Sequence, residues 1–419
     1  MREYKIHTLS NGIRVVHNQV TTSKIVHCGF MLDVGSRDET YENQGIAHFW
    51  EHMAFKGTRK RKSFHILNRL EAVGGELNAF TDKEKICFFA SLRDEYFERA
   101  VELLTDITFN SIFPKNQLER ERNVILEEMA MYYDDPDGAL QDEFDALLFG
   151  KHSMGMNILG RQDSVKSFSR KNFQDFIRAN LDTQKIIFSV VGNISFDKVK
   201  ELAQKYFGKI PSVKTYQKRK KILRYTPDQK TIERPVQQSK CAIGRTAFSI
   251  HDERRVLFYF LNNIFGGPGM NSRLNLTLRE KHGYVYSIGS QFVPFTDTGI
   301  FVITFGTEPK QIPKAIELVK KELNKMADSP MGSRQLSVAK EQFLGQMAMA
   351  EENNGGYMML MARSVLDIGH VPSLDKMFQT IKTTTSKQLQ QLAIDMFDEK
   401  EMSTLVLKPG SKLTVGSEQ

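Results

Sequence analysis

Ile86-Cys-Phe-Phe-Ala-Ser-Leu92, followed by Ala100-Val-Glu-Leu-Leu104, is the stretch that decides the fold. The first run has the length and apolar content of a strand, and the second lies in a helical pattern. A similar pair recurs later as Phe301-Val-Ile-Thr-Phe305 and Ala315-Ile-Glu-Leu-Val319. The shared order, at a spacing of 215 to 218 residues through the chain, predicts that one unit is duplicated.

Both copies alternate short strand-like runs with amphipathic helices of roughly 12 residues or more. Each copy therefore predicts an α+β structure in which helices pack on a sheet. We expect two homologous α/β-sandwich halves, at residues 1–211 and 234–419. The charged segment 212–233, with prolines in and beside it, is the predicted linker.

The composition is that of a globular protein, with 40% hydrophobic and 26% charged residues among 419. The longest apolar runs, such as Ile186 to Val191, are far shorter than the ~20 residues that span a bilayer. Residues 1–6 lack the apolar core of a signal peptide. Cys28, Cys87 and Cys241 are odd in number and far apart, which fits a reducing compartment. We expect a cytoplasmic protein with no membrane partner.

The formal net charge is +8, and six basic residues with no acidic one lie between Lys214 and Arg224. A solvated linker is the simpler interpretation of this run, and a surface that binds a polyanion is the alternative. Because no nucleic-acid-binding signature accompanies the run, we expect no nucleic-acid partner.

His48-Phe-Trp-Glu-His52 is the motif that carries chemistry. Two histidines four apart on a helix lie about 40° apart, so both imidazoles can reach one metal ion. Glu51 lies beside them, and this H-x-x-E-H order is an inverted form of the zinc-protease helix. Trp50 is expected to be a packing residue. The matching stretch of the second copy, Asn262 to Gly269, has no histidine and no acid, which predicts one metal site per chain.

A third protein ligand is needed, because a catalytic zinc ion has three and leaves one position for water. Glu121, Glu127 and Glu128 are all candidates on spacing alone. The duplication aligns Glu128 with Gln346, so the charge is absent from the second copy, as the histidines are. This favours Glu128 as the ligand, with Glu121 behind it as a carboxylate that orients a ligand.

These residues carry a family resemblance that covers nearly the whole chain. The chain resembles the M16 metallopeptidases (insulinase, pitrilysin and mitochondrial processing peptidase), in their short bacterial M16B class. Beyond the motif at His48, the matching segments are Leu9 to Arg14, Val34 to Glu39, Phe55 to Thr58, Gly74 to Thr81, Leu159-Gly160 and Val191 to Ile194. The resemblance implies that His48, His52 and Glu128 bind one Zn²⁺ and that Glu121 supports them.

The resemblance also implies a function for the second copy. Leu278 to Tyr286 is similar to the family's Arg/Tyr element, with Arg279 and Tyr286 at the matching positions. It implies a clamshell of mixed, mostly antiparallel sheets, with a catalytic N-terminal domain and a substrate-binding C-terminal domain that lacks the metal. Asn78 and the strand edge after Ala79 are expected to hold an extended peptide. The chain departs from the family at Ile86 to Phe89, where hydroxyl-bearing residues are common.

We therefore expect a zinc endopeptidase that cleaves peptides or unfolded segments in a chamber, as a homodimer, with Glu51 as general base. Arg279 and Tyr286 are expected to hold the substrate and the developing charge. The competing interpretation is a non-catalytic, peptide-binding subunit of a heterodimer, because Phe265 to Met270 is similar to the glycine-rich loop of such subunits. A purely structural zinc site would need a fourth ligand such as Cys28 or Cys87.

Overall fold

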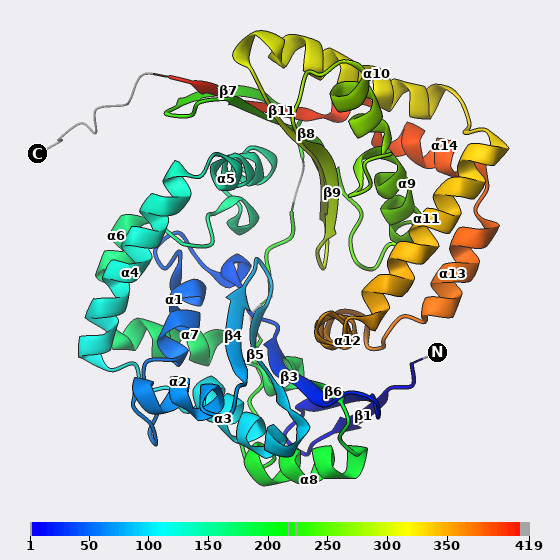
Figure 1. Cartoon of the computed structure of the whole chain (residues 1–419). Coiled ribbons are helices and arrows are strands. Elements are labelled where there is room, and N and C mark those ends of the chain that lie inside the picture. The colour runs from blue at the N-terminus through cyan, green and yellow to red at the C-terminus, as the bar shows by residue number, and fades with distance from the viewer. Residues whose placement is uncertain (1, 217, 223–224, 411–419) are drawn as a thin grey trace, which may run out of the picture. The chain divides into compact units, whose positions relative to one another are not determined.

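The structure is a computed structural model that describes residues 2–216, 218–222 and 225–410 (Figure 1). The chain forms two compact units, each built from three segments of sequence. Of the described residues, the first unit comprises those within 2–129, 156–220 and 348–372, and the second comprises those within 130–155, 221–347 and 373–410. Among the described residues, every helix is too short or too polar to cross a bilayer.

The first unit contains a six-stranded sheet in the order β1-β2-β6-β3-β5-β4. Only the β2–β6 pair is parallel, and the other neighbours are antiparallel. This confirms the predicted mixed, mostly antiparallel sheet. The strands are β1 (Lys5–Thr8), β2 (Arg14–Gln19), β3 (Ile25–Leu32), β4 (Glu76–Thr81), β5 (Ile86–Arg93) and β6 (Ile186–Gly192).

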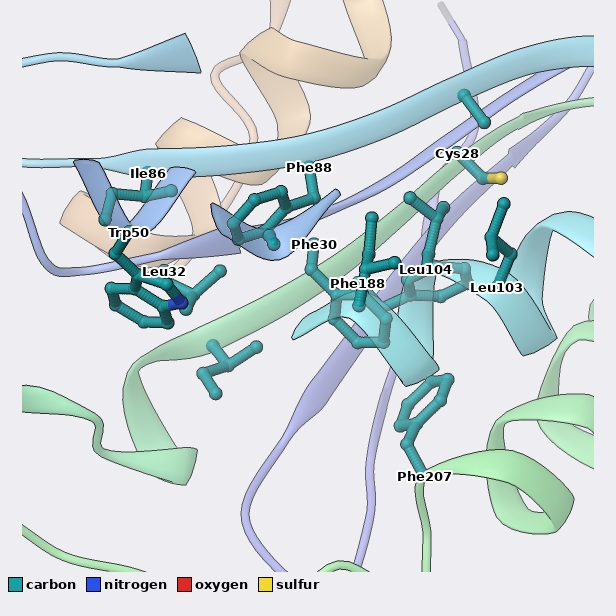
Figure 2. Packing of buried hydrophobic residues seen from close by; sticks show 14 of the residues in the cluster. Cys28, Phe30, Leu32, Trp50, Ile86, Phe88, Leu103, Leu104, Phe188 and Phe207 are labelled. Atoms are coloured by element: carbon teal, nitrogen blue, oxygen red, sulfur yellow. The ribbon is translucent and has the colours of Figure 1, made fainter. Parts of the chain in front are cut away.

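Successive residues of each strand point to opposite sides of this sheet. Both faces are apolar because both sets of residues are largely apolar. On one face, Phe30, Phe88 and Phe188 pack with helices such as α3 (Figure 2). On the other face, Met31 and Ile187 pack against α12. The helices of this unit are α1 (Ile46–Ala54), α2 (Ser63–Glu71), α3 (Phe97–Phe109), α6 (Gln162–Ser167), α7 (Arg170–Asn180), α8 (Phe196–Tyr206) and α12 (Asn354–Ile368).

The second unit repeats this arrangement with a five-stranded sheet in the order β7-β11-β8-β10-β9. Here too the pair β7–β11 is parallel and the remaining neighbours are antiparallel. The strands are β7 (Gln229–Arg234), β8 (Ser239–Ala247), β9 (Ile288–Pro294), β10 (Gly299–Thr307) and β11 (Ser403–Pro409). The helices are α5 (Pro136–Phe149), α9 (Arg255–Gly266), α10 (Ile312–Asp328), α13 (Leu374–Thr383), α14 (Ser386–Met396) and a short π-helix, Asn275–Lys281.

Two long helices, α4 (Lys115–Asp134) and α11 (Ser333–Glu352), each contain one of the points at which the chain passes from one unit to the other. The remaining helical pieces are short 3₁₀ turns at Ser36–Asp38, Asp94–Tyr96, Ser153–Gly155, Thr183–Lys185, Pro309–Gln311 and Glu399–Glu401. The matching strand order, together with α4 and α11 of 20 residues each, supports the predicted duplication.

The compact units differ from the predicted contiguous domains in two segments. Residues 130–155, which contain α5, pack in the second unit, and residues 348–372, which contain α12, pack in the first. In each case the helix covers the second apolar face of a sheet that comes mainly from the other half of the sequence. A sheet with two apolar faces requires a cover on both, and the duplicated halves exchange one helix each to provide it.

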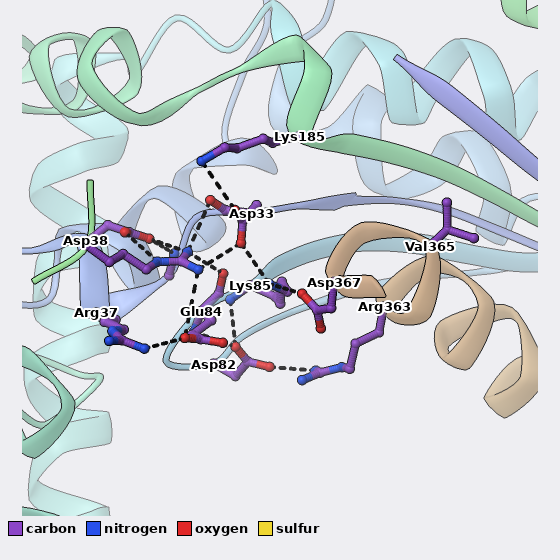
Figure 3. A network of polar contacts seen from close by, with 12 residues as sticks. Asp33, Arg37, Asp38, Asp82, Glu84, Lys85, Lys185, Arg363, Val365 and Asp367 are labelled. Atoms are coloured by element: carbon purple, nitrogen blue, oxygen red, sulfur yellow. Dashed lines mark hydrogen bonds and ion pairs between the residues drawn. The ribbon is translucent and has the colours of Figure 1, made fainter. Parts of the chain in front are cut away.

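The predicted solvated linker is wrong at Arg219, whose guanidinium pairs with carboxylates of the first unit. Figure 3 shows the charged network to which these carboxylates belong. The Arg219 guanidinium lies 2.8 Å from Asp38 and 2.9 Å from Asp33. Lys85, almost fully buried, lies 2.7 Å from Asp33 and 2.7 Å from Asp367 of α12. Burial opposes ionisation of Asp33, but Lys85 and Arg219 hold its pKa below the ordinary value. At Arg219 the basic run is therefore held by ion pairs with carboxylates that are distant in the sequence.

Candidate metal centre

Helix α1 begins at a tightly constrained turn. The Glu39 carboxylate accepts hydrogen bonds from the backbone N–H groups of Gly45 and Ala47, both at 2.8 Å. Gly45 has φ +94°, and a Cβ there would lie 2.6 Å from the carbonyl oxygen of Leu159. Gly160 faces it with φ +88°. The segments around Glu39 and Leu159, which are far apart in the sequence, therefore both contact the first turn of α1 and fix where this helix begins.

Helix α1 buries its apolar face and leaves the three motif side chains together. Phe49 and Trp50 are fully buried. The Trp50 ring centroid lies 6.4 Å from that of Phe88, so the structure places this residue in the core, as expected of a packing residue. His48, Glu51 and His52 lie on the remaining face at the spacing i, i+3, i+4.

His48, His52 and Glu128 converge, although Glu128 lies on α4. Candidate ligand atoms of all three lie within 4.8 Å of one another. His48 Nε2 is 3.7 Å from Glu128 Oε1, and His52 Nε2 is 3.5 Å from Glu128 Oε2. Ligand atoms at tetrahedral zinc, with bonds of about 2.0–2.1 Å, lie roughly 3.3 Å apart. The separations in this cluster therefore fit a zinc ion with only small adjustments.

The surroundings of the cluster also suit a metal. Glu121 Oε1 lies 3.0 Å from His52 Nδ1, which leaves His52 Nε2 facing Glu128. Lys56 Nζ lies 2.7 Å from Glu121 Oε2. Although burial opposes it, hydrogen bonding to His52 and Lys56 keeps the pKa of Glu121 below its ordinary value. Burial, with a smaller effect of His52, lowers the pKa of His48 to about 3, so its imidazole is neutral, as a metal ligand must be.

Glu51 lies beside the cluster and is held from one side. Its Oε2 accepts a hydrogen bond of 2.6 Å from the hydroxyl of Thr81. Burial raises the pKa of Glu51, and this hydrogen bond partly offsets the increase. Glu127, the third ligand candidate on spacing alone, is exposed and is not part of the cluster.

The structure also places the predicted substrate-binding residues of the first unit. Asn78 and Ala79 lie on β4, which pairs only with β5 among the described strands. Asn78 is exposed, and its Oδ1 accepts a hydrogen bond from the N–H of Ala79. Helix α1 packs against this strand. The strand edge is therefore close to the helix that carries the histidines.

Arg279 and Tyr286 belong to the second unit. Arg279 lies in the π-helix, with its guanidinium carbon 5.9 Å from the centroid of the Tyr286 ring. Tyr286 is 84% exposed. Arg279 lines a cavity of about 480 Å³ together with Gly266, Gly267 and part of β9. The structure brings this pair together within its own unit, and its predicted approach to the metal cluster stays a prediction.

The second unit contains the degenerate counterpart of the cluster. In the alignment of the two copies, Asn263 and Gln346 take the positions of His48 and Glu128. The Asn263 amide donates a hydrogen bond of 2.8 Å to Gln346 Oε1. Two neutral amide side chains therefore hydrogen-bond to each other at the positions where the first unit has an imidazole and a carboxylate.

Two residues of the site were not predicted, Lys56 and Thr81. Lys56 follows His52 by four residues, the spacing of one helical turn, which is a usable signal. Thr81 is the last residue of β4, and its side chain points to the same side of the strand as that of Ala79, two residues before it. Its contact with Glu51 depends on how that strand packs on α1, and no local pattern encodes it.

Comparison with known proteins identifies the family of the chain. The family model of the insulinases (peptidase family M16) matches residues 14–162, and that of the peptidase M16 inactive domain matches residues 167–343. The chain therefore belongs to peptidase family M16. An uncharacterized zinc protease of Bacillus subtilis, YmxG, is 31% identical over 97% of this chain and 99% of its own length. One from Streptomyces coelicolor is 30% identical over 95% of this chain and 88% of its own. These relatives support a zinc peptidase.

Solved structures show the same fold. A protease from Helicobacter pylori has a TM-score of 0.89 at 21% identity and covers 98% of this chain and 100% of its own. A peptidase M16 inactive domain structure from Pseudomonas fluorescens has a TM-score of 0.89 at 18% identity, over 97% and 98% of the two chains. The predicted α+β fold with two helix-covered sheets is thus confirmed.

Proposed function

We propose that the chain is a zinc endopeptidase with one Zn²⁺ per chain, bound by His48, His52 and Glu128. The observation that carries this proposal is the convergence of these three side chains with Glu51 beside them. When bound, zinc supplies Lewis-acid chemistry that polarises a peptide carbonyl and makes water more acidic. Glu51 accepts a proton from water and delivers it to the leaving nitrogen.

The proposed substrates are peptides and unfolded segments in extended conformation. The open edge of β4 offers main-chain hydrogen bonds to such a strand, next to the helix of the metal cluster. The proposal gives Arg279 and Tyr286 the task of holding the substrate, because a guanidinium pairs with carbonyl and carboxylate groups and a phenol donates to an oxyanion. It also includes a homodimer, which light scattering of the purified protein tests.

Replacement of the general base tests the mechanism. We expect Glu51→Gln to abolish cleavage of a peptide library, read by mass spectrometry, while zinc content stays near one per chain. The control is Glu127→Gln, an exposed acid beside the ligand Glu128, which should keep wild-type activity. Cleavage by Glu51→Gln at the wild-type rate would disprove the assignment. A zinc content near zero in the wild type would instead favour the non-catalytic subunit.

A further inference from the structure

The hydroxyl of Thr81 contacts Glu51, and the mechanism proposed above gives this contact no role. It donates its hydrogen bond to Glu51 Oε2 over 2.6 Å. Thr81 is the last residue of the edge strand β4, whereas Glu51 lies in α1. Valine would suit the end of a strand as well as threonine does, because both are β-branched. The hydroxyl, rather than the shape of the side chain, is therefore what this position adds.

The turn that follows Thr81 is fixed by its own hydrogen bonds. Asp82 Oδ1 accepts from the backbone N–H groups of Glu84 and Lys85, at 2.8 and 2.6 Å. Asp82 Oδ2 accepts from the Arg363 guanidinium of α12 at 2.6 Å (Figure 3). One carboxylate thus closes the β4–β5 hairpin and ties it to a helix that lies on the sheet.

The same hairpin is held from two further directions. Lys85 is buried between the carboxylates of Asp33 and Asp367, each at 2.7 Å. Gly35 also approaches the hairpin so closely that a Cβ there would lie 2.5 Å from the carbonyl oxygen of Lys83. Backbone fixed in this way gives Thr81 a fixed position from which to direct its hydroxyl.

We infer that Thr81 is a positioning residue that holds one oxygen of Glu51, so that the other is left free for proton transfer. A glutamate side chain has three rotatable bonds, and a base serves proton transfer only when it lies within hydrogen-bond reach of the proton. The bond from Thr81 removes most of that freedom before substrate binds. Small displacements of a catalytic group cost rate, which is why such a contact matters. This inference rests on the proposed role of Glu51.

The test compares Thr81→Val, which removes only the hydroxyl, with Thr81→Ser, which keeps it. We expect Thr81→Val to lower kcat about tenfold, equivalent to about 1.4 kcal/mol in the barrier, with KM and bound zinc unchanged. Thr81→Ser should stay within about twofold of the wild type. Thr22→Val, the same change at an exposed position before β3, is the control and should have no effect.

Crystal structures of the same variants give a readout that does not depend on activity. Glu51 should occupy one conformer in the wild type and in Thr81→Ser, and several in Thr81→Val. An ordered Glu51 in the wild-type position in Thr81→Val overturns the inference, whatever the activity. So does a loss in Thr81→Ser equal to that in Thr81→Val, or a change in KM alone. If Thr81→Val does not fold, Thr81→Ala replaces it in both measurements.

An inactive wild type with zinc bound would refute the proposed function instead. In that case the crystal structures still decide whether the Thr81 hydroxyl orders Glu51. The two failures are therefore distinguishable, because one concerns peptide cleavage and the other concerns the conformation of a single side chain.

Discussion

Glu121 contacts His52 through one carboxylate oxygen and Lys56 through the other. The first contact fixes which imidazole nitrogen carries the proton, and the second neutralises the charge that would otherwise repel Glu128. In the proposed site, Glu121 therefore acts on the metal indirectly, through His52. Spacing alone allowed three glutamates, and the duplication favoured Glu128 with Glu121 behind it. The structure places Glu128 in the cluster, Glu121 against His52 and Glu127 in solvent.

We predict that Glu121→Ala lowers the affinity for zinc by about 10- to 100-fold without abolishing binding. The physical cause is the loss of the acceptor that orients His52. Competition with a chromophoric chelator measures the change. Glu119→Ala, an exposed acid on the same helix, is the matched control, and an equal loss in that variant would show that the effect is general to α4.

At the scale of elements, β2 and α8 meet through His17, whose ring lies against Phe196 with centroids 5.6 Å apart. Burial lowers the pKa of His17 to about 4, and a hydrogen bond that its ring donates to the backbone of Ile194 opposes this shift only weakly. The folded protein therefore keeps this imidazole neutral at a pH where the unfolded chain protonates it.

This shift predicts a pH dependence of stability. Between about pH 6.5 and 4 the unfolded state binds the extra proton, so the free energy of unfolding falls as the pH falls through this window. The full effect is on the order of 3 kcal/mol. Urea unfolding of His17→Phe should lack this component, whereas His370→Phe, at an exposed histidine, should keep it. Parallel pH profiles for wild type and His17→Phe would contradict the assignment.

Elements were predictable from the sequence where the signal is local. The apolar run at Ile86–Leu92 became β5, and the histidine spacing placed both imidazoles on one face of α1. The cover of each sheet was not predictable, because an amphipathic helix such as α12 shows an apolar face but not which sheet receives it. The partners of Arg219 were equally hidden, since a basic run looks the same in sequence whether it is solvated or paired.

At the scale of the whole molecule, the linker contributes to the stability of the first unit through Arg219. We predict that Arg219→Met lowers the free energy of unfolding by about 3 kcal/mol, because it leaves Asp33 and Asp38 partly buried without this cation. Lys218→Met removes an exposed charge from the neighbouring position and should change stability little. Chemical denaturation of both variants measures the difference, and equal stabilities would show that the contact is dispensable.

The hydrogen bond between Asn263 and Gln346 gives the chain an internal, metal-independent reference. At the proposed site, chelation removes the ion that joins α1 to α4, whereas the second unit keeps its hydrogen bond between Asn263 and Gln346. We predict that hydrogen–deuterium exchange after zinc removal speeds up in peptides from α1 and α4 but not in those from α9 and α11. Equal acceleration in both sets would contradict a single metal site. A duplicated protein with the metal cluster in one copy can thus report, within one molecule, how much of its rigidity comes from a bound metal.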